Sequence, residues 1–292
     1  MHRRALRILL AAACVGLLPL RAAAAEAPGS AVDRELAALK ADALELGREL
    51  QATERAARFP GGTQTSIYVA VRVSGFLLDR VSVRVDGGEP QRHEYSGSEA
   101  LSLLKDDGWH RLARLRLEPG SHRLQAEFSG RFHDARAGEP AISGRIEAAF
   151  DKGAGELDLV LPIVRSNPAD PRAPTQPVET RRLTAPRTAW LLAPERVELA
   201  PDSKAIGGPD DPRLRAALFL KNDYRHFSAL VELADLQQAT GRSDALPASF
   251  WLLMAECYLG FGMEAQAGAL YQRLAAGARD PQALARAQLQ LA

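Results

Sequence analysis

The spacing of apolar residues changes along this chain, and the change excludes a fold built from one kind of element. Between residues 31 and 58, apolar side chains recur every three or four positions, which is the spacing of one helix face. Between residues 64 and 165 they alternate with polar residues, as in β-strands. The helical spacing returns from residue 211. A length of 292 residues exceeds one ordinary domain, so the sequence predicts a multidomain α+β protein.

The first 25 residues have the three parts of a secretory signal peptide. Basic residues open the segment, an apolar run covers residues 8–20, and four alanines occupy residues 22–25. The run is too short for a membrane-spanning helix, which needs about 20 apolar residues. We therefore predict that residues 1–25 are removed before Glu26. The mature protein is then expected in the periplasm or in association with the outer membrane.

The balance of charge argues against a nucleic-acid partner. The formal charge of the whole chain is +1, but four arginines and no acidic residue lie in the first 25 positions. Without that segment the formal charge is −3. A faintly acidic chain has no basic footprint for a phosphate backbone, so we expect no binding to nucleic acid.

The chain has two cysteines, and they are not expected to form an intrachain disulfide. Cys14 lies in the signal segment, which leaves Cys257 alone in the mature chain. We predict that Cys257 is a reduced, buried and inert thiol. Residues 11–14, Ala-Ala-Ala-Cys, loosely resemble a lipoprotein box, although the usual leucine is Ala here. Lipidation of Cys14 is the alternative to cleavage before Glu26, and we expect membrane attachment only in that case.

The helical pattern of residues 31–58 places apolar side chains on one stripe. The stripe follows the alternating three and four spacing of a coiled-coil seam, and its large members are Leu36, Leu39, Leu46 and Leu50. One interpretation is a short coiled coil that joins two or more copies into a homo-oligomer. The other is an amphipathic helix that docks on its own protein. Ala43 and Ala57 weaken the seam, so both interpretations stay open.

Residues 64–165 are predicted to form about seven short strands in antiparallel sheets packed as a β-sandwich, with one apolar and one charged face per sheet. Ser96 and Glu99 have the spacing of a capping box that opens a short helix through Leu104. Pro119-Gly120 suits the centre of a type II turn. The hairpin of residues 117–124 resembles that of the small immunoglobulin-like modules of bacterial surface proteins, of the PEGA-like kind.

Prolines recur throughout residues 166–210 and break regular elements there. We predict an extended, semi-rigid linker between the sandwich and the C-terminal region.

Residues 211–292 are helical and self-similar. Ala217 and Ala229 are twelve residues apart, as are Ala255 and Ala267, and the two pairs are offset by 38. Small residues at such positions let antiparallel helices approach closely. The stretch from Trp251 to Tyr258, followed by Gly262, Ala267, Tyr271 and Pro281, is similar to tetratricopeptide repeats. The resemblance implies an α-solenoid whose concave face binds a segment of a partner protein.

The end of the sequence carries a predicted helix over residues 283–292. This helix presents three large apolar side chains and one charge; the apolar ones are Leu284, Leu289 and Leu291. We expect these leucines to contact further protein, either sequence that continues beyond Ala292 or another subunit.

No known catalytic motif is present. The chain lacks a glycine-rich phosphate loop, a His-Glu-x-x-His zinc motif and a Gly-x-Ser-x-Gly nucleophile turn. Four histidines fall in the sandwich region at irregular spacing, which does not suit a metal site: His93, His110, His122 and His133. We therefore predict no catalytic residue, metal or cofactor, and a protein that is not an enzyme.

These patterns favour a non-enzymatic scaffold or adaptor of the cell envelope that binds other envelope proteins through its repeats. The alternative is a carbohydrate- or peptidoglycan-binding module centred on the sandwich. In that case Tyr95 and Trp109 are expected to be exposed, so that their rings can stack on a sugar.

Overall fold

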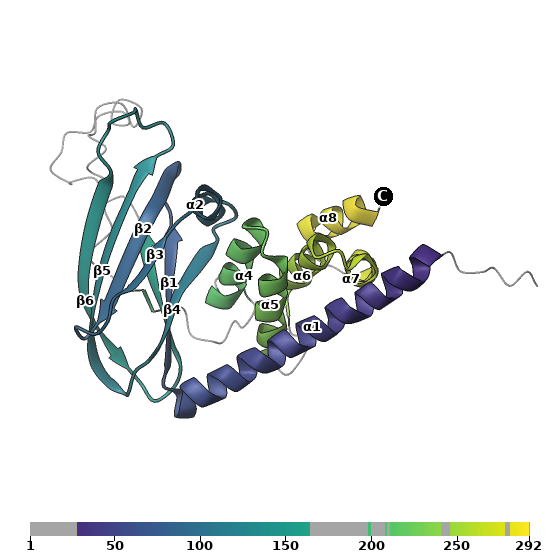
Figure 1. Ribbon diagram of the computed structural model, residues 1–292, viewed down its shortest axis with the longest axis horizontal. Coiled ribbons are helices and arrows are strands. Elements are labelled where there is room, and N and C mark those ends of the chain that lie inside the picture. The colour runs from purple at the N-terminus through teal and green to yellow at the C-terminus, as the bar shows by residue number, and fades with distance from the viewer. Residues whose placement is uncertain are drawn as a thin grey trace, which may run out of the picture. The chain divides into compact units, whose positions relative to one another are not determined.

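The computed structural model describes residues 28–163, 198–199, 208, 211–240, 246–277 and 281–291 (Figure 1). The predicted signal peptide, Cys14 and most of the predicted linker lie outside these residues. The chain divides into two compact units at Leu39 and Lys40, and each is described by itself. The described part of the first unit is the start of one helix, α1 (Pro28–Arg58), which ends at the predicted residue and begins three residues before the predicted start. All other elements belong to the second unit.

Seven strands form the predicted sandwich, and an eighth joins one of its sheets. The strands are β1 (Gln64–Val71), β2 (Phe76–Val85), β3 (Gln91–Glu94), β4 (Trp109–Arg116), β5 (Gly120–Phe132), β6 (Ile142–Lys152), β7 (Leu157–Ile163) and β8 (Glu198–Leu199). One sheet has the order β4-β1-β7-β8, and the other has the order β3-β2-β5-β6. The two-residue strand β8 lies inside the segment predicted to be a linker.

The expectation of purely antiparallel sheets is wrong for one pair. β1 and β7 are parallel, with Ile67 opposite Leu159 and Val69 opposite Leu161. Parallel strands cannot be joined by a tight hairpin, and these two are separated by most of the sandwich. The pairing is therefore non-local, and turn patterns in the sequence give no signal of it.

The sandwich core follows the alternation in the strands. Side chains such as Ile67, Val83, Leu124 and Leu159 point between the sheets and are almost fully buried. The other face of β1 is also buried, because Tyr68 and Ala70 pack with Ala216 of α4 (Pro212–Asn222). The predicted charged outer face is therefore wrong for this strand, since a helix covers it.

The capping-box prediction in the sandwich is confirmed, but the type II turn predicted at Pro119-Gly120 is wrong, because Gly120 has a φ of 149° and is the first residue of β5, opposite Lys152. Ser96 caps α2 (Gly97–Leu104) in a capping box with Glu99. Asp106 and Asp107 form a turn with positive φ angles of 56° and 53°. The carbonyl oxygens of this turn accept hydrogen bonds from Arg215 of α4, at 3.0 Å for Asp106. This turn is one of the places where α4 is held against the sandwich.

The C-terminal region is a set of helix pairs. α4 packs on α5 (His226–Thr240), α6 (Ala248–Gly260) packs on α7 (Glu264–Gly277), and α8 (Pro281–Leu291) follows. The four alanines predicted at the crossings, Ala217, Ala229, Ala255 and Ala267, are all buried. Cys257 is fully buried among these helices, as predicted, and burial raises the pKa of its thiol to about 12.

Candidate functional site

Strand β4 presents two arginines on the same outer face because of a β-bulge. In the register with β1, Arg111 lies opposite Tyr68 and Arg114 lies opposite Ser66. The register shifts between Ile67 and Tyr68, so Leu112 is an extra residue in β4. Side chains three positions apart normally point to opposite faces of a strand, and the extra residue reverses this. Both guanidinium groups are thereby turned toward the helices.

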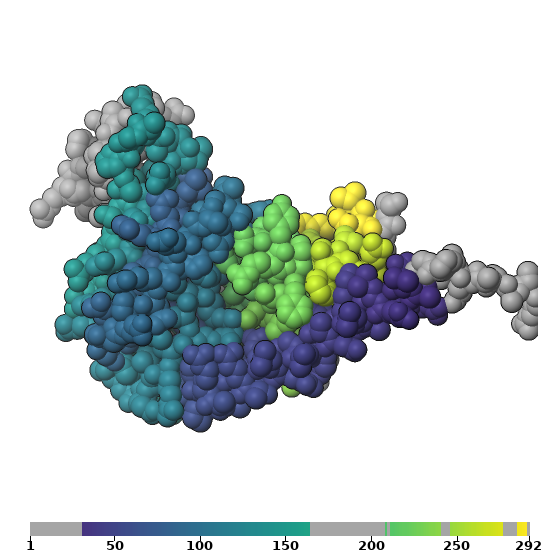
Figure 2. All heavy atoms as spheres, viewed as in Figure 1, coloured from purple at the N-terminus to yellow at the C-terminus, as the bar shows by residue number. Residues whose placement is uncertain are grey.

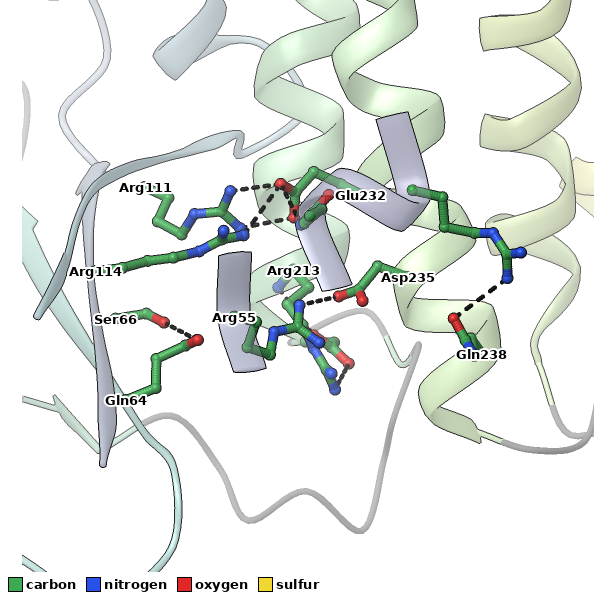
Figure 3. A network of polar contacts seen from close by, with 12 residues as sticks. Arg55, Gln64, Ser66, Arg111, Arg114, Arg213, Glu232, Asp235 and Gln238 are labelled. Carbon is green, nitrogen blue, oxygen red and sulfur yellow. Dashed lines mark hydrogen bonds and ion pairs between the residues drawn. The ribbon is translucent and has the colours of Figure 1, made fainter. Parts of the chain in front are cut away.

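Both arginines meet Glu232 of α5, as Figure 3 shows. Arg111 donates two hydrogen bonds to the two carboxylate oxygens of Glu232, one of them 2.6 Å long. Gln51 of α1 donates a third, at 3.2 Å. Arg114 is farther away, with 3.4 Å between its Nη2 and Oε1 of Glu232. Arg111 therefore pairs with both carboxylate oxygens of Glu232, whereas Arg114 makes only one long hydrogen bond to it.

The electrostatics follow from this arrangement. Burial alone would raise the pKa of Glu232, but its attraction to Arg111 and its hydrogen bonds outweigh burial, and the net pKa is lowered. The pKa of Arg111 is raised, because its pairing with Glu232 outweighs burial. The pKa of Arg114 is lowered by burial and by repulsion from Arg111. Arginine still stays protonated, so Glu232 faces two cations with one negative charge.

The C-terminal part of α1 completes the site. Arg55 forms an ion pair with Asp235 of α5 (Figure 3), and Lys40 donates a 2.9 Å hydrogen bond to the carbonyl oxygen of Gly262. Gly47 has no side chain, and a Cβ added there would lie 3.0 Å from the ring of Phe227. Residues 40–58 therefore dock on the helix pairs through polar contacts, the small Gly47 and the partly buried Leu44. Figure 2 shows this part of the helix lying against the C-terminal helices.

A cavity of about 380 Å³ lies beside the ion cluster, between β4, α4, α5 and α1. Its polar wall includes Arg111, Arg114, Arg225, Glu54 and Glu232, and its remaining wall is largely apolar. This volume is in the range of small-ligand pockets, which are roughly 300–1,000 Å³. The arrangement can bind a small group or side chain, and it contains no nucleophile paired with a base.

The predicted coiled-coil seam is exposed. Leu36 is 46 % exposed, and Leu39, Leu46 and Leu50 are each 66 % exposed. The helix docks from Lys40 onward, but it does so through another face. The two interpretations of this segment are therefore compatible, because docking leaves the apolar stripe uncovered.

Of the three leucines predicted to contact further protein at the C-terminal end, the structure describes the side chain of Leu289. Leu289 of α8 is 73 % exposed, whereas Ala287 of the same helix is buried in the helical core. The side chains of Leu284 and Leu291 lie outside the described residues.

The expected exposure of the sugar-stacking pair is wrong. Trp109 is only 3 % exposed and packs between β1 and α4, and Tyr95 is half-buried. The Tyr95 hydroxyl is hydrogen-bonded to Nδ1 of His110 at 2.9 Å, and the ring of His93 lies against both rings. Neither aromatic residue offers an open ring face to a sugar.

The histidines of the sandwich are not gathered around a metal position. No group of three histidine, cysteine or acidic side chains with metal-binding geometry occurs in the described part of the chain. His93 contacts Glu99 at 3.1 Å. Burial, and then the nearby His93, lower the pKa of His110 to about 3, so this ring is neutral at physiological pH.

Comparison with known proteins leaves the family open. No family model, curated protein or solved structure matches the chain. Of the helices described here, none is both long and apolar enough to cross a membrane.

Sequence reasoning missed Arg111, Arg114 and Glu232. These residues read as ordinary surface charges in a strand and a helix, because the bulge and the pairing of β4 with α5 are non-local. One signal was available: Glu232 stands between Val231 and Leu233, on a helix whose neighbouring positions are almost all apolar.

Proposed function

We propose that this protein is a non-enzymatic scaffold or adaptor that assembles with other proteins of the cell envelope. The observation that carries the proposal is the exposed leucine stripe of α1. A helix that docks through one face and displays a stripe of large apolar side chains on another is suited to association with another helix. Burying one leucine side chain stabilises a complex by roughly 1.5–3 kcal/mol, so four leucines supply enough for a weak to moderate contact.

The coupling of the helices to the sandwich supports a scaffolding role. Buried ion pairs at Glu232 and Asp235 tie α5 to β4 and α1, and Ala216 packs on the outer face of β1. A partner bound to the helix pairs would therefore be held in a fixed position relative to the sandwich.

The type of the helical repeats, the type of the sandwich and the export of the chain are part of the same proposal. We infer that α4–α8 are tetratricopeptide-like repeats, supported by the buried alanines at the two crossings. The sandwich is proposed to be immunoglobulin-like, of the PEGA-like kind. Residues 1–25 are proposed to export the chain, and the mature protein is expected to begin near Glu26, which mass spectrometry of the native protein tests.

The stripe can be tested by replacing Leu36, Leu39, Leu46 and Leu50 together with serine. We expect the wild-type protein to form a homo-oligomer in light scattering coupled to gel filtration, and the variant to be monomeric. The thermal midpoint of the monomer should change little, because these side chains are already exposed. A monomeric wild-type protein at concentrations of tens of micromolar would count against self-association through α1.

The matched control removes apolar surface elsewhere. Leu101 of α2 and Leu259 of α6 are 59 % and 42 % exposed, and their replacement with serine should leave the oligomeric state unchanged. Cross-linking in native envelopes with the same two variants then tests the wider function. The scaffold proposal expects the cross-linked partners to be lost with the stripe variant and kept with the control.

A further inference from the structure

We propose that the cavity between β4, α4, α5 and α1 binds a carboxylate carried on an apolar group, with Arg114 as the principal contact and Arg225 at the rim. This inference does not rest on the proposed scaffold function, although Leu50 belongs both to the exposed stripe and to the wall of this cavity. It assigns a ligand class to a pocket that no sequence motif predicts.

The first argument is an imbalance of charge in the pocket wall. Three arginines and two glutamates line the cavity. Arg111 occupies both oxygens of Glu232, and Glu54 accepts a 2.6 Å hydrogen bond from Arg58, which is not a lining residue. Two cations, Arg114 and Arg225, therefore remain without a full counter-charge inside the cavity.

The second argument is the hydrogen-bonding state of Arg114. Its Nε is buried and has no hydrogen-bond partner among the described residues, and its one contact to Glu232 is 3.4 Å long. A guanidinium group has five N–H donors in a planar fork that matches a carboxylate. A buried charge without full hydrogen bonding is costly, so a bound carboxylate would relieve an existing deficit.

The third argument is the placement of Arg225. It follows α4 in the chain and lines the same cavity, and the described residues provide its guanidinium with no hydrogen bond or ion pair. An exposed cation at the mouth of a cavity raises the local concentration of anions and speeds their association. Arg225 is thus placed to attract the ligand, and Arg114 is placed to hold it.

The fourth argument concerns the apolar part of the ligand. Phe219, Leu220, Phe227 and Val231 line the same cavity, together with Leu50 of α1. An inorganic anion would leave this surface uncovered, whereas an acyl chain or an aromatic side chain next to the carboxylate would bury it. Two sources have this chemistry: a small apolar acid, and the free C-terminus of a peptide that ends in an apolar residue.

The test measures binding to the intact protein by calorimetry with two matched pairs of probes. One pair is acetyl-Leu-Phe with a free carboxylate and with a C-terminal amide, and the other is octanoate and octanamide. We expect at least one free acid to bind about tenfold or more tightly than its amide, because hydrogen bonds to charged groups are the stronger kind. The acid that binds more tightly identifies the source.

The variant Arg114→Met separates a binding role from a structural one. Glu232 keeps Arg111 and Gln51 in this variant, so the thermal midpoint of the free protein should stay the same or rise. Affinity for the acid should fall about tenfold or more. The control is Arg116→Met on the same strand, which is not a lining residue of this cavity and should change neither quantity. Arg225→Met should weaken binding mainly at low salt, because an exposed charge is screened.

Several results would overturn the proposal. These are no binding of either acid, equal affinity for an acid and its amide, and unchanged affinity in Arg114→Met. A lowered thermal midpoint of ligand-free Arg114→Met would show that Arg114 is a structural partner of Glu232 instead.

Discussion

Arg111 and Glu232 lie 121 positions apart in the sequence and join β4 to α5 through two parallel hydrogen bonds. Both side chains are mostly buried, with 19 % and 7 % of their side-chain surface exposed. Such a pair adds little net stability, because the cost of desolvating both charges offsets their attraction. Removing only one of the two charges is nevertheless strongly destabilising, because the other charge stays buried without a partner. The pair therefore fixes which surfaces of the sandwich and the helices meet.

Replacing Glu232 with Gln should destabilise the protein by about 3–5 kcal/mol, because Arg111 and Arg114 would remain buried without a negative charge. Denaturant unfolding followed by circular dichroism measures this loss. The double variant Arg111→Met with Glu232→Gln should cost less than the two single changes together. Glu264 is an exposed glutamate of α7, and its change to Gln should have little effect. A loss below about 1 kcal/mol for Glu232→Gln would show that the pair does not hold the interface.

Acid should destabilise the protein through His110. Burial lowers the pKa of this ring to about 3, whereas in the unfolded chain it titrates near 6.5. Between these values the unfolded state binds a proton that the folded state does not, so stability is complete above pH 6.5 and falls as the pH decreases toward 3. The contribution to the slope is at most about 1.4 kcal/mol per pH unit.

The control for this pH dependence is His110→Gln, which cannot titrate. Unfolding measured from pH 7 to pH 4 should show a shallower loss of stability for the variant than for the wild type. Burial also lowers the pKa of His226, so this ring adds to the loss in the same pH range and part of the slope should remain in the variant. Glu232 also has a lowered folded pKa, and its contribution to stability is lost only below about pH 4.5. Identical slopes above pH 5 would place the titrating group elsewhere.

Elements set by local patterns were predictable from the sequence. Three of them depend on spacings within one or two elements: the helix α1 and its end at Arg58, the capping box of Ser96 with Glu99, and the alanines of the helix crossings. The seven strands of the sandwich follow from alternation in the same way.

Features that depend on distant segments were not predictable. Three features each require two segments that are far apart in the chain: the parallel pairing of β1 with β7, the burial of Trp109 under α4, and the docking of α1 on the helix pairs. The candidate pocket has the same origin: one inserted residue in β4 turns Arg114 toward the helices, and nothing in the local sequence marks that insertion. The sequence patterns therefore predict the elements but not the surface where they meet.

The crossing of α6 and α7 should not tolerate a larger side chain. Ala267 is 1 % exposed, and leucine there would overpack the crossing at a cost of about 1–3 kcal/mol. The matched control is Ala269→Leu on the exposed face of the same helix, which should be neutral within about 0.5 kcal/mol. Thermal unfolding of the two variants tests this, and equal midpoints would show that the crossing is loosely packed.

The thiol of Cys257 should react only when the helix pairs open. It is fully buried in α6, and burial raises its pKa to about 12, so the reactive thiolate is scarce and shielded at neutral pH. We expect labelling by a maleimide or by Ellman's reagent to be slow in the folded protein and fast in denaturant. Because Ala267→Leu weakens the crossing beside this cysteine, the variant should label faster than the wild type, whereas Ala269→Leu should not. Rapid labelling of the folded wild-type protein would mean that α6 turns another face to the core than the one described here.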